Sequence, residues 1–281
     1  MKLAAHRYGK SRVRVMKIIR HGAVHTIKEL DVAVAIEGDF ESSYTSGDNR
    51  LVVATDTMKN TVNVLAQRHL GIETEPFVTT VAQHFLKQYP QVATVTVTAR
   101  ERVWDRLNIQ GAPHPHSFVH AQQARPFAKA RATREGIMIE SGIGDLLILK
   151  SAESGFAGFP RCEWTTLAET NDRILATALT ATWVWQDEPL SHAVANRRII
   201  AALLECFSAH FSPSVQTTMF QMGTAALEAC SEISSVHLVM PNKHCLLINL
   251  EPFGIENRHE LFVPTDEPHG QIEATVTRDV A

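Results

Sequence analysis

The sequence predicts an α+β fold with antiparallel sheets, made from one unit that occurs twice along the chain. Some segments carry apolar residues at every second position, as half-buried strands do, and others carry them at the spacing of amphipathic helices. The order of strands, two helices and strands is found once in residues 1–128 and again in residues 129–281. We therefore expect two domains with these boundaries, meeting in a stretch rich in Lys and Arg near residues 127–134.

The first domain is expected to open with a hairpin that turns at Gly22. Two amphipathic helices follow, the second of which starts at Pro76, a residue suited to the first turn of a helix. Thr and Val then alternate with the period of a strand. The predicted elements are strands over residues 12–20 and 30–36, helices over 57–68 and from Pro76, and strands over 94–99 and 116–125.

The second domain is expected to repeat this order. Ile199, Leu203 and Phe207 belong to one apolar helical stripe, and Ser212-Pro213 is a start signal for the next helix. The predicted elements are strands over residues 130–139, 145–150 and 178–185, helices over 199–207 and 215–230, and strands over 236–240, 245–250 and 272–276.

The predicted sheets have one polar face, because Thr94, Thr96 and Thr98 alternate with apolar residues. We expect the helices to cover the other face and the polar face to line a water-filled channel. Exposed sheet edges favour unwanted pairing, and closure of the edges by another copy of the chain is the expected solution.

Bulk composition excludes several classes of protein. The chain has 281 residues, 44% hydrophobic and 20% charged, with a formal net charge of −3, so charge does not indicate a nucleic-acid partner. No apolar run approaches the roughly 20 residues of a membrane-spanning helix, and the N-terminus lacks a signal-peptide core. The C-terminus is not a peroxisomal address. We expect a cytoplasmic protein with no membrane partner.

The four cysteines indicate a reducing compartment. They form no C-x-x-C pair, and three of them lie in apolar runs, so buried free thiols are expected. The cysteines are Cys162, Cys206, Cys230 and Cys245.

The polar junction at residues 53–61 is the most informative stretch of the chain. It lies where a strand gives way to a helix, a position that presents hydroxyl, carboxylate and backbone N–H groups together. On its own it predicts a helix cap made by Thr55 or Asp56. Other polar and aromatic residues, among them Lys10 and Asn242, also have ordinary structural explanations when each is taken alone.

Taken together, these motifs resemble the urate oxidase (uricase) family over nearly the whole chain and in order. The matching segments are Tyr8-Gly9-Lys10, Val13-Arg14-Val15 with Lys17, Ser43-Tyr44-Thr45 with Asp48-Asn49, Ala54-Thr55-Asp56 with Lys59-Asn60-Thr61, Pro113-His114-Pro115-His116-Ser117-Phe118, Leu149-Lys150-Ser151, Phe156 with Gly158-Phe159, Thr165-Thr166-Leu167 with Glu169-Thr170, Asp172-Arg173-Ile174, Ala181-Thr182-Trp183, Ser214-Val215-Gln216 and Pro241-Asn242-Lys243-His244. The joint match is specific, although no single segment is.

The resemblance implies a fold and an assembly. It predicts two tandem tunnelling-fold (T-fold) domains, with antiparallel sheets, helices on one face and a homotetramer enclosing a barrel-like tunnel. Each active site is expected at a subunit boundary. One chain would supply Lys10, Thr55 and Asp56, and its neighbour would supply Phe156, Arg173, Val215, Gln216, Asn242 and His244.

The resemblance also implies an activity, the oxidation of urate with O2 and water to 5-hydroxyisourate and H2O2, without a metal or organic cofactor. Arg173 can present a charged fork to a flat lactam, Gln216 can match a lactam edge with its amide, and Phe156 can stack on the ring. Backbone groups of Asp56 and Val215 are further expected contacts.

The resemblance assigns proton transfer to a relay of Lys10, Thr55 and His244. Asn242, together with Thr55, is expected to hold O2 or water over the purine. A lysine with its usual pKa of about 10.4 is already protonated at neutral pH and is a poor proton acceptor, so the relay requires an environment that favours the neutral amine.

Two rival functions stay open. The His114-Pro115-His116 pair is similar to the zinc-binding pair of T-fold pterin- or purine-processing enzymes, although zinc needs a third protein ligand. The second rival function is that of a T-fold tetramer that binds purines without turning them over. Cys162, Trp164 and Ala157 depart from the usual family residues, and we expect them to affect packing near Phe156.

Overall fold

The structure, a computed structural model, describes residues 1–121 and 124–278 of the chain. Two compact units are present. The first contains Met1–Gly142 and Glu188–Ala193, and the second contains Ile143–Asp187 and the chain from Val194 on. Every strand pairing given for the named sheets is antiparallel, which confirms the predicted α+β class. The domain boundary predicted between residues 128 and 129 stays a prediction.

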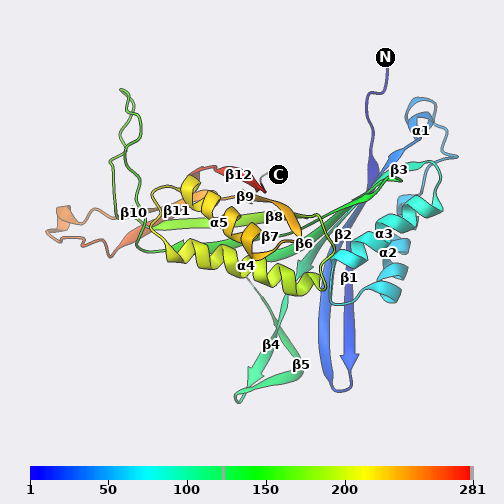
Figure 1. Cartoon of the computed structure of the whole chain (residues 1–281), viewed down its shortest axis with the longest axis horizontal. Helices are drawn as coiled ribbons and strands as arrows, with labels where there is room; N and C mark the ends of the chain where they lie inside the picture. Colours follow the sequence, from blue (N-terminus) through cyan, green and yellow to red (C-terminus); the bar gives the residue numbers. More distant parts are fainter. Residues whose placement is uncertain (122–123, 279–281) are drawn as a thin grey trace. The chain divides into compact units, whose positions relative to one another are not determined.

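The first unit is a sheet with strand order β1-β2-β3-β6 and helices α2 and α3 on one face, next to β1, β3 and β6 (Figure 1). The strand β7 begins in this unit and ends in the second. The elements are β1 (Tyr8–His21), β2 (Val24–Gly38), α1 (Glu41–Thr45), α2 (Thr55–His69), α3 (Glu75–Gln88), β3 (Val92–Arg102), β4 (Trp104–Ile109), β5 (Ala112–His120), β6 (Arg125–Ala132) and β7 (Ile137–Lys150).

The core of the first unit follows the sequence pattern. Alternate residues of β2, such as Val32 and Ile36, are fully buried, and Val95 and Val97 of β3 lie beside them. Phe85 and its neighbours along one stripe of α3 cover this apolar face. Because the buried set repeats every second residue in the strands and every third or fourth in the helices, the two patterns meet in one core.

Two sequence predictions in the first unit are wrong. Residues 116–125 do not close the sheet, because β5 pairs with β4 in a separate two-stranded sheet and β6 lies beside β3. Residues 122–123 of that prediction lie outside the described residues. The strand predicted over 130–139 is interrupted by a turn in which the Thr133 N–H donates to the Gly136 carbonyl at 2.9 Å. The turn was not predicted because the residues before and after it both have the alternating pattern of a strand.

In the second unit, β8 pairs with both β9 and β10, β9 pairs with β12, and β10 pairs with β11. The helix α5 packs on β9 and β12. The strand predicted over 245–250 begins three residues earlier, and β11 was not predicted. The elements are β8 (Leu175–Trp185), α4 (His192–Ala209), α5 (Val215–Ala229), β9 (Ile233–Val239), β10 (Asn242–Leu247), the 3-10 turn η1 (Glu251–Phe253), β11 (Phe262–Gly270) and β12 (Glu273–Thr277).

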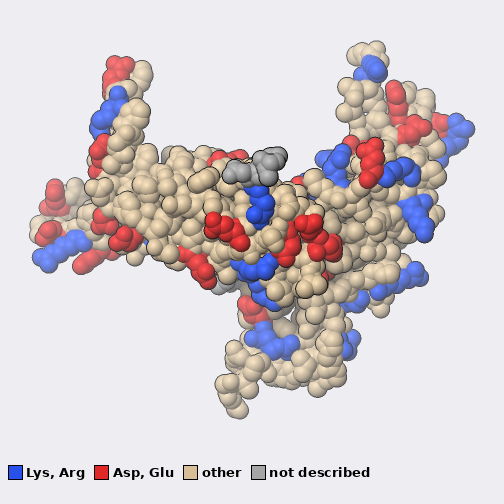
Figure 2. All heavy atoms as spheres, viewed as in Figure 1, with Lys and Arg blue, Asp and Glu red and all other residues tan. Residues whose placement is uncertain are grey.

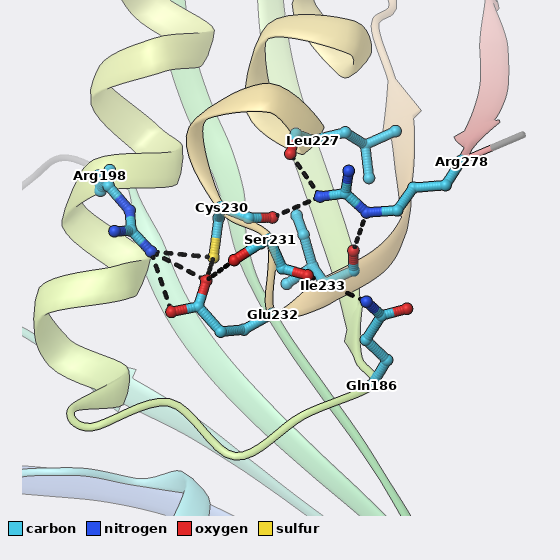
Figure 3. A network of polar contacts seen from close by, with 8 residues as sticks. All are labelled: Gln186, Arg198, Leu227, Cys230, Ser231, Glu232, Ile233 and Arg278. Atoms are coloured by element: carbon cyan, nitrogen blue, oxygen red, sulfur yellow. Dashed lines mark hydrogen bonds and ion pairs between the residues drawn. The ribbon is translucent and has the colours of Figure 1, made fainter.

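A polar network ties the end of α5 to the residue that follows β12 (Figure 3). The Arg278 guanidinium donates to the carbonyl oxygens of Leu227 and Cys230, at the C-terminus of α5, and to that of Ile233. The last carbonyls of a helix have no partner within the helix, and a cation there is favourable. Arg198 of α4 joins this network through Glu232, 3.1 Å away.

The cysteine prediction is confirmed in one respect and wrong in another. All four cysteines are free, as expected. Only Cys230 is buried, whereas Cys206 and Cys245 are half-buried and Cys162 is exposed. The prediction that the thiols are buried is therefore wrong for Cys162, Cys206 and Cys245.

The face drawn in Figure 2 carries mixed charge, with basic and acidic side chains interspersed over it. Within residues 1–121 and 124–278, no helix has the length and apolar content needed to cross a membrane.

Candidate active site

Lys10 lies on β1 immediately before a β-bulge. Lys10 pairs with Val34 and Val13 with Val32, so two residues of β1, Ser11 and Arg12, stand opposite the single Ala33 of β2. One of them, Arg12, has a positive φ of 58°. Bulges bend a strand and redirect its side chains, and they are common beside active sites. The half-buried Lys10 therefore stands where the ladder of β1 and β2 is interrupted.

Gly9 allows β1 to approach β2 closely beside Lys10. A Cβ atom at this position would lie 1.9 Å from the Val34 carbonyl oxygen and 2.8 Å from the Ala35 Cα. No L-residue with a side chain fits such an approach without moving the backbone. Glycine in the Tyr8-Gly9-Lys10 segment therefore sets the position of Lys10 relative to β2.

Thr55 and Asp56 form the first turn of α2. The N-cap is Ala54, which has no side chain able to cap, and neither Thr55 nor Asp56 caps the helix, so that prediction is wrong. Both side chains are exposed. The hydrogen bond and charge of Lys59 lower the pKa of Asp56, and the charge of Lys10 lowers it further. The N-terminus of α2 thus presents an ionised carboxylate and an exposed hydroxyl within the field of Lys10.

Tyr8 links the strand of Lys10 to the helix of Thr55. The Val53 N–H donates to the Tyr8 hydroxyl oxygen at 2.7 Å, just before α2 begins. Burial raises the pKa of Tyr8, so the phenol stays neutral. The Tyr8 ring packs edge to face against Phe40, with centroids 5.0 Å apart. This contact orders the chain that leads into Thr55.

Phe156 and Arg173 meet in the second unit. The Arg173 Cζ lies 5.5 Å from the centroid of the Phe156 ring. Phe156 exchanges two backbone hydrogen bonds with Thr170, at 2.7 and 3.1 Å, and the Arg173 N–H donates to the Ser154 carbonyl at 2.9 Å. These bonds join residues 154–156 to residues 170–173, so the ring and the guanidinium are held on two paired segments.

The Arg173 side chain keeps an unused buried donor. Its Nε donates to the Ser154 hydroxyl at 3.3 Å, while its Nη2 is buried and has no hydrogen-bond partner within the described residues. Burial lowers the pKa of Arg173 from its ordinary value, and a guanidinium stays charged at any physiological pH. A buried, charged donor without an acceptor is costly, so this group is suited to an incoming anion or carbonyl oxygen.

Val215 and Gln216 begin α5 next to this segment. The Gly155 N–H donates to the Ser212 carbonyl at 2.8 Å, which fixes residues 154–155 against the chain that enters α5. The Ser214 hydroxyl caps the helix by accepting from the Thr217 N–H at 3.1 Å. Val215 is buried, and Gln216 is exposed in the first helical turn. The early N–H groups of α5 and the Gln216 amide are thus presented together.

Asn242 and His244 lie on β10, paired with the strand that follows Arg173. Asn242 is directly opposite Thr177 of β8, whose hydroxyl is buried and has no partner in the described part of the chain. Directly opposite residues of antiparallel strands project to the same face. His244 is exposed, and its carbonyl accepts a hydrogen bond from Thr265 at 3.2 Å.

The nine predicted site residues therefore divide between the units. The first unit carries Lys10, Thr55 and Asp56, and the second unit carries Phe156, Arg173, Val215, Gln216, Asn242 and His244. This division matches the division into two half-sites that the family resemblance implies. Neither their roles nor the joining of the two half-sites is tested by this arrangement.

The His114-x-His116 pair lies on β5 with ring centroids 4.7 Å apart. Among the residues that the structure describes, no group of three or more His, Cys, Asp or Glu side chains is arranged to hold a metal ion.

Sequence reasoning missed Phe159 and Ser154. The Phe159 ring stacks on Phe156 with centroids 4.9 Å apart and an interplanar angle of 12°, and Ser154 binds Arg173 twice. Two Phe residues on either side of a Gly-containing turn were a usable signal for the first contact. The second depends on segments far apart in sequence, so no local pattern indicates it.

Comparisons with known proteins agree with this picture. The model of the family described as Uricase matches residues 6–131 and 139–273. The uricase of Arthrobacter globiformis is 38% identical over 277 residues, covering 99% of this chain and 90% of the relative. The uricase of Aspergillus flavus is 37% identical over 292 residues, covering 98% and 96% of the two chains.

Solved structures are similar over the same extent. The crystal structure of the uricase from Arthrobacter globiformis has a TM-score of 0.95 at 38% identity and covers 100% of this chain and 96% of that chain. A uricase structure from Bacillus fastidious has a TM-score of 0.85 at 24% identity, covers 98% of this chain and 94% of its own, and supports the fold alone. With a family model and relatives that span nearly its whole length, this chain belongs to the uricase family.

Proposed function

We propose that this protein is a urate oxidase that converts urate, O2 and water to 5-hydroxyisourate and H2O2. The equation balances, because urate loses two electrons and gains a hydroxyl group from water while O2 is reduced to H2O2. Family membership supports the reaction class. The observation that carries the proposal is the buried Arg173 Nη2 without an acceptor, beside an aromatic ring.

The second unit supplies the groups that a flat, anionic purine requires. Arg173 can donate to a carbonyl oxygen and a ring nitrogen of urate along one edge. The Gln216 amide can both donate and accept along a lactam edge, and Phe156 can stack on the ring. Desolvation of Arg173 strengthens its attraction to an anion. Binding of urate would therefore satisfy the donor that the free protein leaves unsatisfied.

The proton relay belongs to the same proposal. Lys10 would accept a proton through the Thr55 hydroxyl, and His244 would complete the relay from the other half-site. Thr55 and Asn242 would hold O2 and then water over the purine plane. The bulge beside Lys10 and the exposed position of Thr55 at the start of α2 support these roles.

We further propose a homotetramer in which each site takes Lys10, Thr55 and Asp56 from one chain and the remaining residues from another. Co-expression of Lys10→Met with Arg173→Ala tests this arrangement. The assay uses urate well below the parental KM, where both variants should be slow. Mixed assemblies would contain some sites with both wild-type halves, so the rate should exceed that of either variant alone. If each site is made within one chain, the mixture is no faster than the average of the two variants. Analytical ultracentrifugation gives the size of the assembly independently.

The reaction is proposed to need no metal or organic cofactor, because the urate dianion is electron-rich enough to react with O2 directly. Elemental analysis and turnover with and without a chelator test this. Stoichiometric metal together with activity lost to the chelator would refute it.

Loss of the ultraviolet absorbance of urate in aerobic buffer, with H2O2 measured in parallel, tests the function as a whole. Urate consumption with one H2O2 per urate is expected, and none without O2. Binding of urate without consumption would leave the purine-binding T-fold protein as the better description.

A further inference from the structure

Phe159 forms an aromatic column with Phe156 that the assigned substrate contacts do not include. The two rings are nearly parallel, with an interplanar angle of 12° and centroids 4.9 Å apart. Rings lying side by side in one plane cannot approach this closely, so the pair is face to face with an offset. Phe159 therefore lies over one face of the Phe156 ring, with the two ring centres offset.

Each ring of this pair is also in contact with an arginine. The Arg173 Cζ is 5.5 Å from the Phe156 centroid, and the Arg161 Cζ is 5.7 Å from the Phe159 centroid. The Arg161 Nη1 also donates to the Leu167 carbonyl at 3.3 Å, which holds the outer guanidinium in place. Cations over ring faces are favourable at such distances. Arg161, Phe159, Phe156 and Arg173 are thus linked by successive contacts, and the last of them is the proposed substrate fork.

The backbone between the two rings is specialised for this contact. Gly158 has a φ of +73°, a left-handed conformation that glycine adopts readily, and its N–H donates to a Glu169 carboxylate oxygen at 3.2 Å. The turn brings Phe159 back over Phe156, whose own backbone is paired with Thr170. Ala157, between them, is exposed, so the side chain at the tip of the turn does not make the stack.

We propose that Phe159 is a positioning residue for the substrate, holding the Phe156 ring parallel to the plane in which urate binds. The inference rests on the proposed function, because the plane that matters is that of a flat purine. Phe156 would otherwise rotate about its side-chain bonds, and binding would have to restrict that rotation. With Phe159 and Arg161 behind it, the ring is ordered before the substrate arrives.

The experiment compares Phe159→Leu, which keeps an apolar side chain but removes the ring, with Phe159→Tyr, which keeps the ring. Steady-state urate oxidation should show a KM about threefold to tenfold higher for Phe159→Leu, with kcat within about twofold of the parent. Phe159→Tyr should keep the parental KM. Phe253→Leu is the matched control, since it makes the same change at a phenylalanine that is 74% exposed, and its KM should not change.

A purely structural role predicts a different result. Loss of packing would then lower kcat at the same time as it raises KM. Equal KM values for Phe159→Leu and the parent overturn the proposal, as does an equal rise for Phe159→Tyr. If Phe159→Leu does not fold, Phe159→Met takes its place with the same expectations.

Calorimetric binding of xanthine, a flat purine, separates this inference from the proposed function. A parent that binds xanthine but consumes no urate refutes the oxidase proposal alone. In that case, xanthine affinity that is weaker in Phe159→Leu and unchanged in Phe159→Tyr supports the positioning role. The same affinity in all three proteins overturns it.

Discussion

The guanidinium carbon of Arg173 lies 5.5 Å from the centre of the Phe156 ring, while the Nη2 of the same guanidinium is buried without an acceptor. A charged fork and an aromatic face thus meet where backbone pairing has fixed both segments. A flat molecule with carbonyl oxygens along one edge would satisfy both groups at once. This relationship makes the chemistry of the second unit specific enough to test.

Replacement of Arg173 by Ala should chiefly weaken urate binding. Hydrogen bonds to charged groups contribute about 1.5–3 kcal/mol, so KM should rise about tenfold to a hundredfold. Arg173→Lys should recover only part of the loss, because an ammonium lacks the planar fork. Arg258→Ala, which removes an exposed arginine paired with Glu256, is the control for lost charge. Parental urate affinity in Arg173→Ala would rule out the clamp.

Replacement of Lys10 by Met or Thr55 by Ala should slow turnover far more than it weakens binding. Positioned acid–base groups contribute typically about 10²–10⁴-fold to rate, so kcat should fall within that range. Stopped-flow or steady-state assays with urate titrations give the two constants separately. Lys87→Met changes an exposed lysine of α3 and should behave as the parent. Normal turnover combined with poor affinity in Lys10→Met would contradict the relay.

Gly9→Ala should impair both stability and turnover. The added Cβ would meet the Val34 carbonyl oxygen at 1.9 Å, so β1 must move away from β2 beside Lys10. We expect a loss of about 1–3 kcal/mol in urea unfolding, together with a lower kcat. Gly71→Ala is the matched control, because a Cβ there has nothing within 4 Å. Equal unfolding midpoints for the two variants would show that β1 accommodates the methyl group freely.

The stabilising contribution of Glu73 to the first unit should be lost as the pH falls. Burial raises the pKa of Glu73, but hydrogen bonds from the Ser191 hydroxyl and the Ala193 N–H, with the charges of His192 and Lys28, outweigh it and leave the pKa lowered. A carboxyl group with a lowered folded-state pKa stabilises the fold above its unfolded pKa of about 4.3, and this contribution is lost as the pH falls through the folded value.

Glu73→Gln keeps a neutral acceptor and removes the charge. At pH 7 it should be less stable than the parent by about 1 kcal/mol, since charge-assisted bonds to helix N–H groups are stronger than neutral ones. The difference should narrow below about pH 4. Denaturant titrations across this pH range measure it, with the exposed Glu251→Gln as control. A difference independent of pH would show that the charge of Glu73 contributes nothing.

Cys162 should be the first cysteine to react with iodoacetamide. The Thr165 hydroxyl donates to its sulfur at 3.5 Å and, with the Trp164 N–H, lowers the pKa of this exposed thiol. Burial raises the pKa of Cys206 and Cys230. More thiolate at a given pH means faster alkylation. Peptide mass spectrometry over time should show Cys162 first, and Thr165→Val should slow it. Earlier modification of Cys230 would contradict the assignment.

Much of the fold could be read from short-range patterns. The period of two in β2 and the helical stripe of α3 report directly which faces are buried, because burial repeats with backbone geometry. The turn at Thr133–Gly136 was not predicted from these patterns, because it interrupts a strand without a change in composition. The separate pairing of β4 with β5 was not predicted either, because composition does not show which strand is the partner. The cap at α2 was misjudged because Thr55 and Asp56 lie one and two residues inside the helix.

The sequence by itself determined the α+β class, which depends on local periodicity. It also determined the family resemblance, which depends on segments matched in order and which implies the nine candidate residues. Only the tertiary structure decided that Arg173 retains a buried donor, that Lys10 borders a bulge and that Phe159 supports Phe156. Each of these depends on which distant segments are paired and on what is left unpaired once packing is complete. Which groups stay unpaired depends on the whole fold, so no local sequence pattern predicts it.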